Sequence, residues 1–259
     1  MARPRKRRRA GRGRFVDRPI AYALEAALAL GLLYTFGQSF YTFAQTSPTF
    51  GVRNIQAVGL ERLAIDDVVA ASGITTGDNL LFLDKEAIRQ RVESMPYVKT
   101  CGLRVSFPDL VVLDVAERKP FASLMVHSRS YEIDEEGIVL REYTATEMPL
   151  GPFITSVGGL EFVNVGDRVG LPALKAAIAL WKSFGESPLA GEFEVSEIAA
   201  IHEDDLRMYG AAVPFEVRWG RAEFADQVRR LEILWENKGG ELGCNEFLDL
   251  RFGEGLVCR

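Results

Sequence analysis

The sequence predicts an α+β protein with a single N-terminal transmembrane helix, a small βααββ domain, and a mainly antiparallel β domain with two helices. Three observations support this fold class. A basic N-terminus precedes a long apolar segment, a β-α-α-β-β order occupies residues 50–118, and many short alternating segments fill residues 119–259. The composition, 47% hydrophobic and 26% charged among 259 residues, is typical of a folded protein and excludes wholesale disorder.

Charge is distributed unevenly along the chain. Residues 1–19 hold nine lysines and arginines against one acid, Asp17, which is a net charge of +8. Since the whole chain carries −5, the remaining 240 residues carry −13. We therefore expect residues 1–19 to be a basic cytoplasmic tail, in surroundings unlike those of the acidic remainder.

The apolar segment over residues 20–44 is 25 residues long, enough for a helix to cross a hydrocarbon core of about 30 Å. Glu25 is its one charged residue and lies close enough to the start to approach the lipid headgroups. Aromatic residues at the far end fit an interfacial belt. Because the positive charge precedes this segment, we expect a single-pass protein of the bacterial cell inner membrane, with a cytoplasmic N-terminus and a periplasmic C-terminus.

Two alternatives compete with the membrane anchor as interpretations of residues 1–44. The short uninterrupted run Ala26–Leu33, and the resemblance of Thr42–Ala44 to a cleavage site, would fit a signal peptide. The long basic region and the bulky aromatic residues favour retention instead. A nucleic-acid-binding arm is the second alternative, but the basic run has no interleaved aromatic residues and adjoins an apolar segment, so no nucleic-acid partner is expected.

The first exported domain is expected over residues 50–118, after a polar, proline-containing linker at residues 45–49. In its second helix, Ile88, Val92 and Met95 form a stripe that should face the core. The predicted elements are a strand over Phe50–Val58, a helix over Ile65–Ser72, a helix between Asp84 and Pro96, and strands around Leu103–Phe107 and Val111–Val115.

Residues 119–259 are expected to form the β domain. Its two predicted helices, Pro172–Ser183 and Ala222–Asn237, each carry one apolar face. The predicted strands are Phe121–His127, Tyr131–Asp134, Ile138–Arg141, Phe153–Val157, Glu192–Glu203, Leu206–Tyr209, Phe215–Trp219, Phe247–Phe252 and Leu256–Arg259.

The three cysteines are too few for a disulfide scaffold and too scattered for a metal site. A bridge between Cys244 and Cys258 is conceivable if the two lie on neighbouring strands. The favoured interpretation is that both, with Cys101, are small apolar core residues.

No catalytic chemistry is apparent in the sequence. The only histidines, His127 and His202, have no partner at ligand spacing, and no nucleotide-binding, hydrolase or metalloprotease motif occurs. Neighbouring acidic residues fall at helix starts or turns. We therefore expect no enzyme, no catalytic residue, no metal, no cofactor and no small-molecule substrate.

Several motifs in the two domains match a known family. The first domain carries Val52-x-x-Ile55-x-x-Val58-Gly59, Gly77-Asp-Asn-Leu80, Met95-Pro-Tyr-Val98, Leu103-Arg-Val-x-Phe-Pro108 and Glu117-Arg118-Lys-Pro120. The second carries Tyr131-Glu-Ile-Asp134-Glu-Glu-Gly137, Val217-Arg-Trp-Gly220 and Phe247-Leu-Asp249-Leu-Arg251-Phe252. With these motifs the chain resembles the bacterial cell-division family FtsQ/DivIB, over nearly its whole length.

The resemblance implies a POTRA (polypeptide-transport-associated) domain at residues 50–118, followed by a β domain. It further implies a non-enzymatic divisome scaffold at the division septum. The implied partners are the coiled-coil proteins FtsB and FtsL, together with FtsK and the septal synthase FtsW/FtsI. Two other functions stay open: a POTRA-type component of protein transport or outer-membrane assembly, and a membrane-anchored exported enzyme.

The C-terminal hairpin is the expected docking site. A sheet that ends at a chain terminus leaves an edge strand with unpaired backbone groups, and the resemblance implies that a partner adds a strand there. Arg251 would meet an acidic partner residue, and Phe252 would supply an apolar anchor. The expected partner-binding residues are Arg251, Phe252, Gly255, Leu256, Val257, Cys258 and Arg259.

Overall fold

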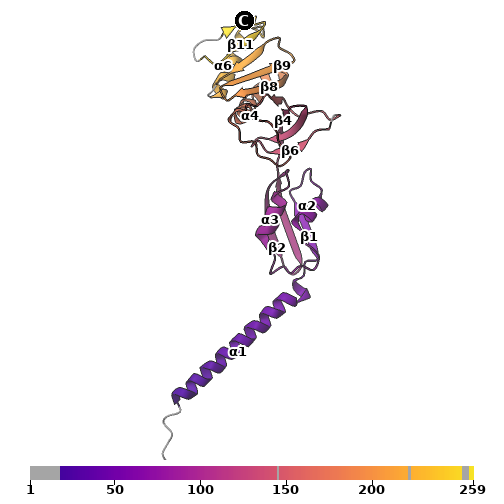
Figure 1. Cartoon of the computed structure of the whole chain (residues 1–259), viewed down its shortest axis with the longest axis vertical. Helices are drawn as coiled ribbons and strands as arrows, with labels where there is room; N and C mark the ends of the chain where they lie inside the picture. The colour runs from indigo at the N-terminus through magenta and orange to yellow at the C-terminus, as the bar shows by residue number, and fades with distance from the viewer. Residues whose placement is uncertain (1–17, 145, 221–222, 253–256) are drawn as a thin grey trace, which may run out of the picture. The chain divides into compact units, whose positions relative to one another are not determined.

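The computed structural model describes residues 18–144, 146–220, 223–252 and 257–259 (Figure 1). Among these residues, no helix combines the length and the apolar character needed to cross a membrane. The chain divides into two compact units, each described by itself below. The first contains Met1–Asn54, Thr75–Asp84 and Val105–Val111, and the second contains Ile55–Ile74, Lys85–Arg104 and Val112–Arg259.

The first unit begins with a long helix, α1 (Arg18–Thr46), which is followed by a 3-10 turn, η1 (Pro48–Phe50). The side-chain amide of Asn79 closes the end of α1, because its Nδ2 donates to the carbonyl oxygens of Ala44 at 2.7 Å and Gln45 at 2.9 Å. Carbonyls in the last turn of a helix have no partner within it, so this side chain supplies one. The predicted linker is therefore mostly a capped helix end and a helical turn.

A three-stranded sheet with two helices forms the βααββ domain. Its elements are β1 (Asn54–Val58), α2 (Ile65–Ser72), α3 (Lys85–Glu93), β2 (Val98–Ser106) and β3 (Leu110–Glu117), and the sheet order is β1-β3-β2. Ile88 and Val92 of α3 are buried as the apolar stripe predicts. The first strand begins later than predicted because Phe50 belongs to η1, and β2 begins earlier, at Val98.

Glu117, at the end of β3, organises the turn that precedes α2. Its carboxylate accepts hydrogen bonds from the backbone N–H groups of Glu61 and Leu63, both at 3.0 Å, and of Arg62 at 2.9 Å. Hydrogen bonds to a charged group are stronger than neutral ones. The Glu-Arg-x-Pro motif thus begins with a residue that closes the turn before α2.

The second unit continues into a nine-stranded sheet of order β12-β11-β10-β9-β8-β7-β4-β5-β6. Five neighbouring pairs in it are antiparallel, and three are parallel: β4 with β7, β7 with β8, and β10 with β11. The strands are β4 (Pro120–Val126), β5 (Arg129–Asp134), β6 (Val139–Glu142), β7 (Phe153–Thr155), β8 (Val195–His202), β9 (Asp205–Gly210), β10 (Glu216–Trp219), β11 (Phe247–Asp249) and β12 (Val257–Cys258).

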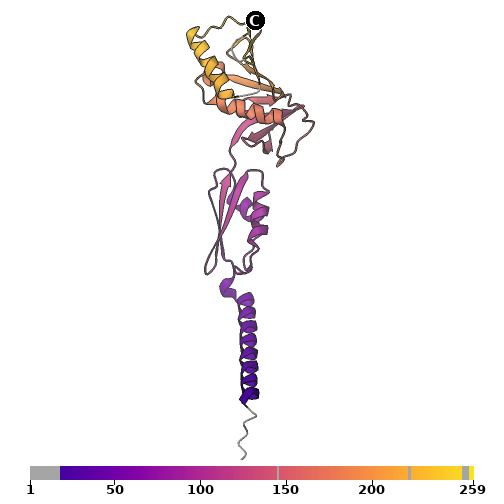
Figure 2. The same ribbon diagram turned by 90° about the vertical axis from the view of Figure 1, so that its left-hand side faces the viewer.

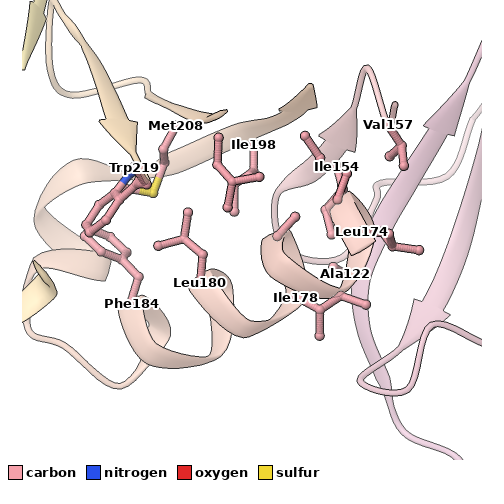
Figure 3. Close-up of a cluster of buried hydrophobic side chains, with 14 of the residues drawn as sticks. Ala122, Ile154, Val157, Leu174, Ile178, Leu180, Phe184, Ile198, Met208 and Trp219 are labelled. Atoms are coloured by element: carbon pink, nitrogen blue, oxygen red, sulfur yellow. The ribbon is translucent and has the colours of Figure 1, made fainter. Parts of the chain in front are cut away.

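Three helices accompany this sheet: α4 (Pro172–Gly185), α5 (Leu189–Phe193) and α6 (Phe224–Asn237). Figure 2 shows α4 and α6 next to each other beside the sheet, and the two helices are in contact. Figure 3 shows the core between α4 and the strands, where Leu180 and Phe184 point toward Ile198, Met208 and Trp219. The rings of Phe184 and Trp219 meet edge-on, with centroids 5.9 Å apart.

Two buried carboxylates on β5, those of Glu132 and Asp134, accept hydrogen bonds from neighbouring side chains. Arg118 donates to Asp134 at 2.8 Å, and Arg141 donates to Glu132 at 2.8 Å. The hydroxyl of Tyr97 also donates to Glu132. Burial, together with this bond to a carboxylate, raises the pKa of Tyr97. Tyr97 and Arg118 belong to sequence motifs of the first domain. Both side chains therefore contact β5, in the first hairpin of the β domain.

Several boundaries in the β domain differ from the sequence prediction, and one predicted boundary lies outside the described residues. The predicted strand Glu192–Glu203 begins too early, because α5 runs to Phe193 and Glu194 follows with a left-handed backbone of φ 47°. His127 is not in a strand but in the turn after β4, with φ 55°. The predicted start of the last helix at Ala222 lies outside the described residues.

Candidate partner-docking edge

The strand β12 lies at one edge of the nine-stranded sheet. It pairs antiparallel with β11, so that Leu248 lies opposite Cys258 and Asp249 lies opposite Val257. In the part of the chain that the structure describes, no strand lies on its other side. Among the described residues, the outer backbone groups of β12 therefore have no neighbouring strand to pair with.

The opposite edge of the sheet is covered by a loop. The N–H of Val139 in β6 donates to the carbonyl of Asp167 at 2.9 Å, and the carbonyl of Val139 accepts from the N–H of Gly166 at 2.8 Å. A bridge between Ile138 and Arg168 extends this pairing. Of the two edges, the one formed by β12 is thus the open one.

The register of β12 decides which of its amides face outward. Arg259 and Phe247 exchange hydrogen bonds, with the N–H of Arg259 donating at 3.0 Å and the N–H of Phe247 donating at 3.3 Å. In an antiparallel pair, hydrogen-bonded residues alternate with residues whose backbone groups point away from the partner strand. The backbone N–H and C=O of Cys258 therefore point outward, whereas those of Val257 point toward β11.

A disulfide between Cys244 and Cys258 joins β12 to the segment that precedes β11, with 5.3 Å between the Cα atoms. The favoured interpretation of all three cysteines as free core residues was therefore wrong for these two, while Cys101 is free and buried. Sequence spacing could not decide the matter, since a separation of 14 residues fits a bridge only if the chain folds back into adjacent strands.

Arg251, predicted to contact an acidic partner residue, is engaged within the chain. Its Nε and Nη2 donate to the Asp249 carboxylate, at 3.0 Å to Oδ1 and 2.6 Å to Oδ2 respectively. Burial raises the pKa of Asp249, but hydrogen bonds from the Arg251 side chain and backbone and the nearby positive charges outweigh it, so the net pKa is lowered. Arg251 keeps about a third of its side chain exposed, at 35%.

Phe252 and Val257 are two exposed apolar side chains among the described residues next to this edge. Phe252 is 53% exposed and Val257 is 46% exposed. The carbonyl of Phe252 accepts a hydrogen bond from Nη1 of Arg230 on α6 at 3.2 Å. Gly255 and Leu256, also predicted to contact a partner, lie outside the described residues.

Gly220 is a contributor to this edge to which sequence reasoning assigned no role. A Cβ at this position would lie 3.0 Å from Cγ and 3.2 Å from Cβ of Arg251. Glycine therefore permits the close approach that holds Arg251 against the end of β10. The Val-Arg-Trp-Gly motif was the sequence signal that drew attention to Gly220. Nothing in the sequence indicated that the Arg251 side chain would pack against this glycine.

Metal and acid–base chemistry find little support in the described residues. They contain no group of three or more His, Cys, Asp or Glu side chains that could hold a metal ion. His202 is exposed, with its Nδ1 3.7 Å from the Asp204 carboxylate.

Comparisons with known proteins point to one family. The family model "POTRA domain, FtsQ-type" matches residues 50–118. "Cell division protein FtsQ" of Syntrophotalea carbinolica is 25% identical over 213 residues, which cover 82% of this chain and 75% of that protein. FtsQ of Anaeromyxobacter sp. (strain K) is 27% identical over 89% of this chain and 79% of its own length. FtsQ of Corynebacterium glutamicum is 26% identical, covering 76% and 83% respectively.

The chain is similar to FtsQ proteins over most of its length, and its residues 50–118 match the FtsQ-type POTRA domain. The resemblance inferred from the motifs is therefore confirmed, and it extends beyond the POTRA domain because the matched regions cover most of the chain. This similarity to FtsQ proteins supports a role in cell division. In this FtsQ-like chain, the open β12 edge and the side chains beside it form the candidate site.

Proposed function

We propose that this FtsQ-like chain is a non-enzymatic scaffold of the divisome, which captures a coiled-coil division protein of the FtsB/FtsL kind at β12. The observation that carries the proposal is the contrast between the two sheet edges, since β6 is covered by a loop and β12 is open. A partner segment in extended conformation would pair with the outward backbone groups of Cys258, and exposed Phe252 and Val257 would supply apolar contacts.

Arg251 has a narrower role in this proposal than the motif suggested. Because its guanidinium already binds Asp249, it would contact an acidic partner residue only with the donors that this ion pair leaves free. Its main contribution would be to keep the backbone after β11 in place. The FtsK-like and FtsW/FtsI-like proteins would then be held in the same assembly at the septum.

The proposal includes an anchor in the cell inner membrane, formed by α1 after a cytoplasmic basic tail. Leucines, tyrosines and phenylalanines along α1 are largely exposed, for example Leu33 at 71%, which suits a lipid environment better than water. A disulfide in the β domain is in keeping with an oxidising compartment such as the periplasm. The POTRA domain and the β domain would then both be exported.

The docking test uses the full chain in detergent and a purified coiled-coil pair of the FtsB/FtsL kind. Phe252→Ala should weaken capture at least about tenfold, since truncating a central aromatic anchor commonly costs 2 kcal/mol or more. Phe162→Ala is the matched control, because Phe162 is also an exposed phenylalanine but lies in the loop after β7, a strand that four others separate from β12 in the sheet order. Binding of the control should equal that of the parent chain.

Hydrogen exchange tests the backbone part of the same proposal. On addition of the partner, exchange of the Cys258 amide should slow, because this N–H points away from β11 and would pair with the added strand. The Val257 amide already faces β11 and should change little. If Phe252→Ala binds like the parent and the Cys258 amide exchanges at the same rate with and without partner, the docking site is elsewhere.

A further inference from the structure

An exposed aromatic cluster lies in the first unit, where α1 ends. Phe82 is 46% exposed and its ring meets that of Tyr41 edge-on, with centroids 5.7 Å apart. Phe107 is 59% exposed and meets Phe50 in the same way at 6.3 Å. We call these four rings the aromatic collar. Large apolar side chains that gather on a surface mark a contact site more often than scattered ones do.

The loop that carries Phe82 is held rigidly. Leu80 is buried, and its N–H donates to the carbonyl of Phe50 at 2.8 Å. The next residue, Leu81, donates its N–H to Oδ1 of Asn79 at 2.9 Å and projects an exposed side chain. The apolar side chains of Leu81 and Phe82 are therefore displayed by a fixed backbone and are not the result of a loose loop.

The length of α1 indicates what covers the collar. Its 29 residues span about 43 Å at 1.5 Å per residue, which matches the roughly 40–45 Å of a bilayer with its headgroup layers. Tyr41 lies five residues before the helix end at Thr46, about 8 Å inside it. In a helix that crosses a bilayer, Tyr41 would thus lie close to the boundary between headgroups and acyl chains, and Phe82, in contact with Tyr41, would share that depth.

We propose that the aromatic collar binds the headgroup layer of the lipid bilayer, so that the two loops that carry Phe82 and Phe107 rest on the membrane surface. The occupant is lipid because the rings are continuous with α1, and because aromatic side chains prefer the membrane–water interface. Phe107 contacts Phe50, which follows the end of α1, so it lies nearer the outer boundary than Phe82 does. This inference rests on the proposed membrane anchor.

The test measures quenching of tryptophan fluorescence by brominated acyl chains, with the full chain reconstituted in phosphatidylcholine vesicles. Three variants each add one tryptophan: Leu33→Trp within α1, Phe82→Trp, and Phe107→Trp. The parent chain supplies the background signal of Trp181, Trp219 and Trp235. Matched vesicles without bromine give the unquenched intensity of every variant.

The expected loss of the added fluorescence is largest for Leu33→Trp, smaller for Phe82→Trp, and smallest but above background for Phe107→Trp. If Leu33→Trp is quenched while Phe82→Trp behaves like the parent, the anchor stands and the collar does not bind lipid. If Leu33→Trp itself is not quenched, the anchor proposal fails and this inference fails with it. Because no partner protein is present, a lack of quenching in Phe82→Trp cannot be caused by a partner that covers the collar.

Discussion

Asp249 is a buried carboxylate whose main charged partner is Arg251. Only 4% of its side chain is exposed, and Arg251 binds it through two nitrogens. The pKa of Asp249 is lowered in the folded state, whereas an unfolded aspartate has a pKa of about 3.9. A depressed folded pKa stabilises the fold above the unfolded pKa, and this contribution is lost as the pH falls through the folded pKa.

Asp249→Asn should therefore lower the free energy of unfolding by about 1–2 kcal/mol at pH 7, since one partner of a partly exposed charged pair is lost. The difference from the parent should shrink between pH 4 and pH 2, measured by denaturant unfolding at each pH. Asp114→Asn is the matched control, because Asp114 pairs with Arg104 on the surface, and it should cost less than about 0.5 kcal/mol. A difference as large at pH 2 as at pH 7 would contradict the assignment to the ion pair.

The role of Arg251 shows what residue-level reasoning could and could not reach. The Asp-Leu-Arg-aromatic motif indicated that Arg251 is important. Asp249 and Arg251 are two residues apart, and such residues lie on one face of an extended segment. That spacing is compatible with an ion pair between Asp249 and Arg251. The family resemblance led instead to the prediction that Arg251 binds an acidic residue of a partner protein. The contact with Gly220 brings together positions 31 residues apart in sequence, which no local pattern indicates.

At the scale of elements, a substitution in α3 tests whether its apolar stripe packs in the core of the POTRA domain. Ile88→Ala should lower the free energy of unfolding by about 2–4 kcal/mol, because Ile88 is 2% exposed and its truncation leaves a cavity. Ile65→Ala is the control, since Ile65 begins α2 with a largely exposed side chain and should cost less than about 0.5 kcal/mol. Equal losses for the two variants, measured by denaturant unfolding, would mean that the helix register is wrong.

The elements that could be predicted are those long enough to show a period. Helices α3 and α4 display apolar faces over several turns, and the strands β4 and β5 alternate around a turn. Helix α5 has five residues, too few for a pattern to stand out, and the strand predicted over Phe153–Val157 is shortened to the three residues of β7. The parallel pairing of β7 with β4 and β8 depends on contacts distant in sequence, so the antiparallel expectation held for most of the sheet but not for these strands.

At the scale of the whole chain, charge is the strongest available argument for orientation. Nine basic residues and one acid precede the apolar segment, and basic residues stay on the cytoplasmic side of a membrane. The sheet edge, the disulfide and the POTRA domain all lie C-terminal to α1. If α1 crosses the membrane once, every feature that we assign to docking is exported together.

This topology is tested by fusing alkaline phosphatase, which is active only after export to an oxidising compartment, behind residue 60. The fusion should be active, because residue 60 follows both α1 and η1. A fusion behind residue 19, which lacks the apolar segment, is the matched control and should be inactive. Mass spectrometry of the mature N-terminus separates the anchor from a cleaved signal peptide, since cleavage would leave a chain that begins near Gln45. An inactive fusion at residue 60 would reverse the orientation, whereas an active fusion with a cleaved N-terminus would preserve export and remove the anchor.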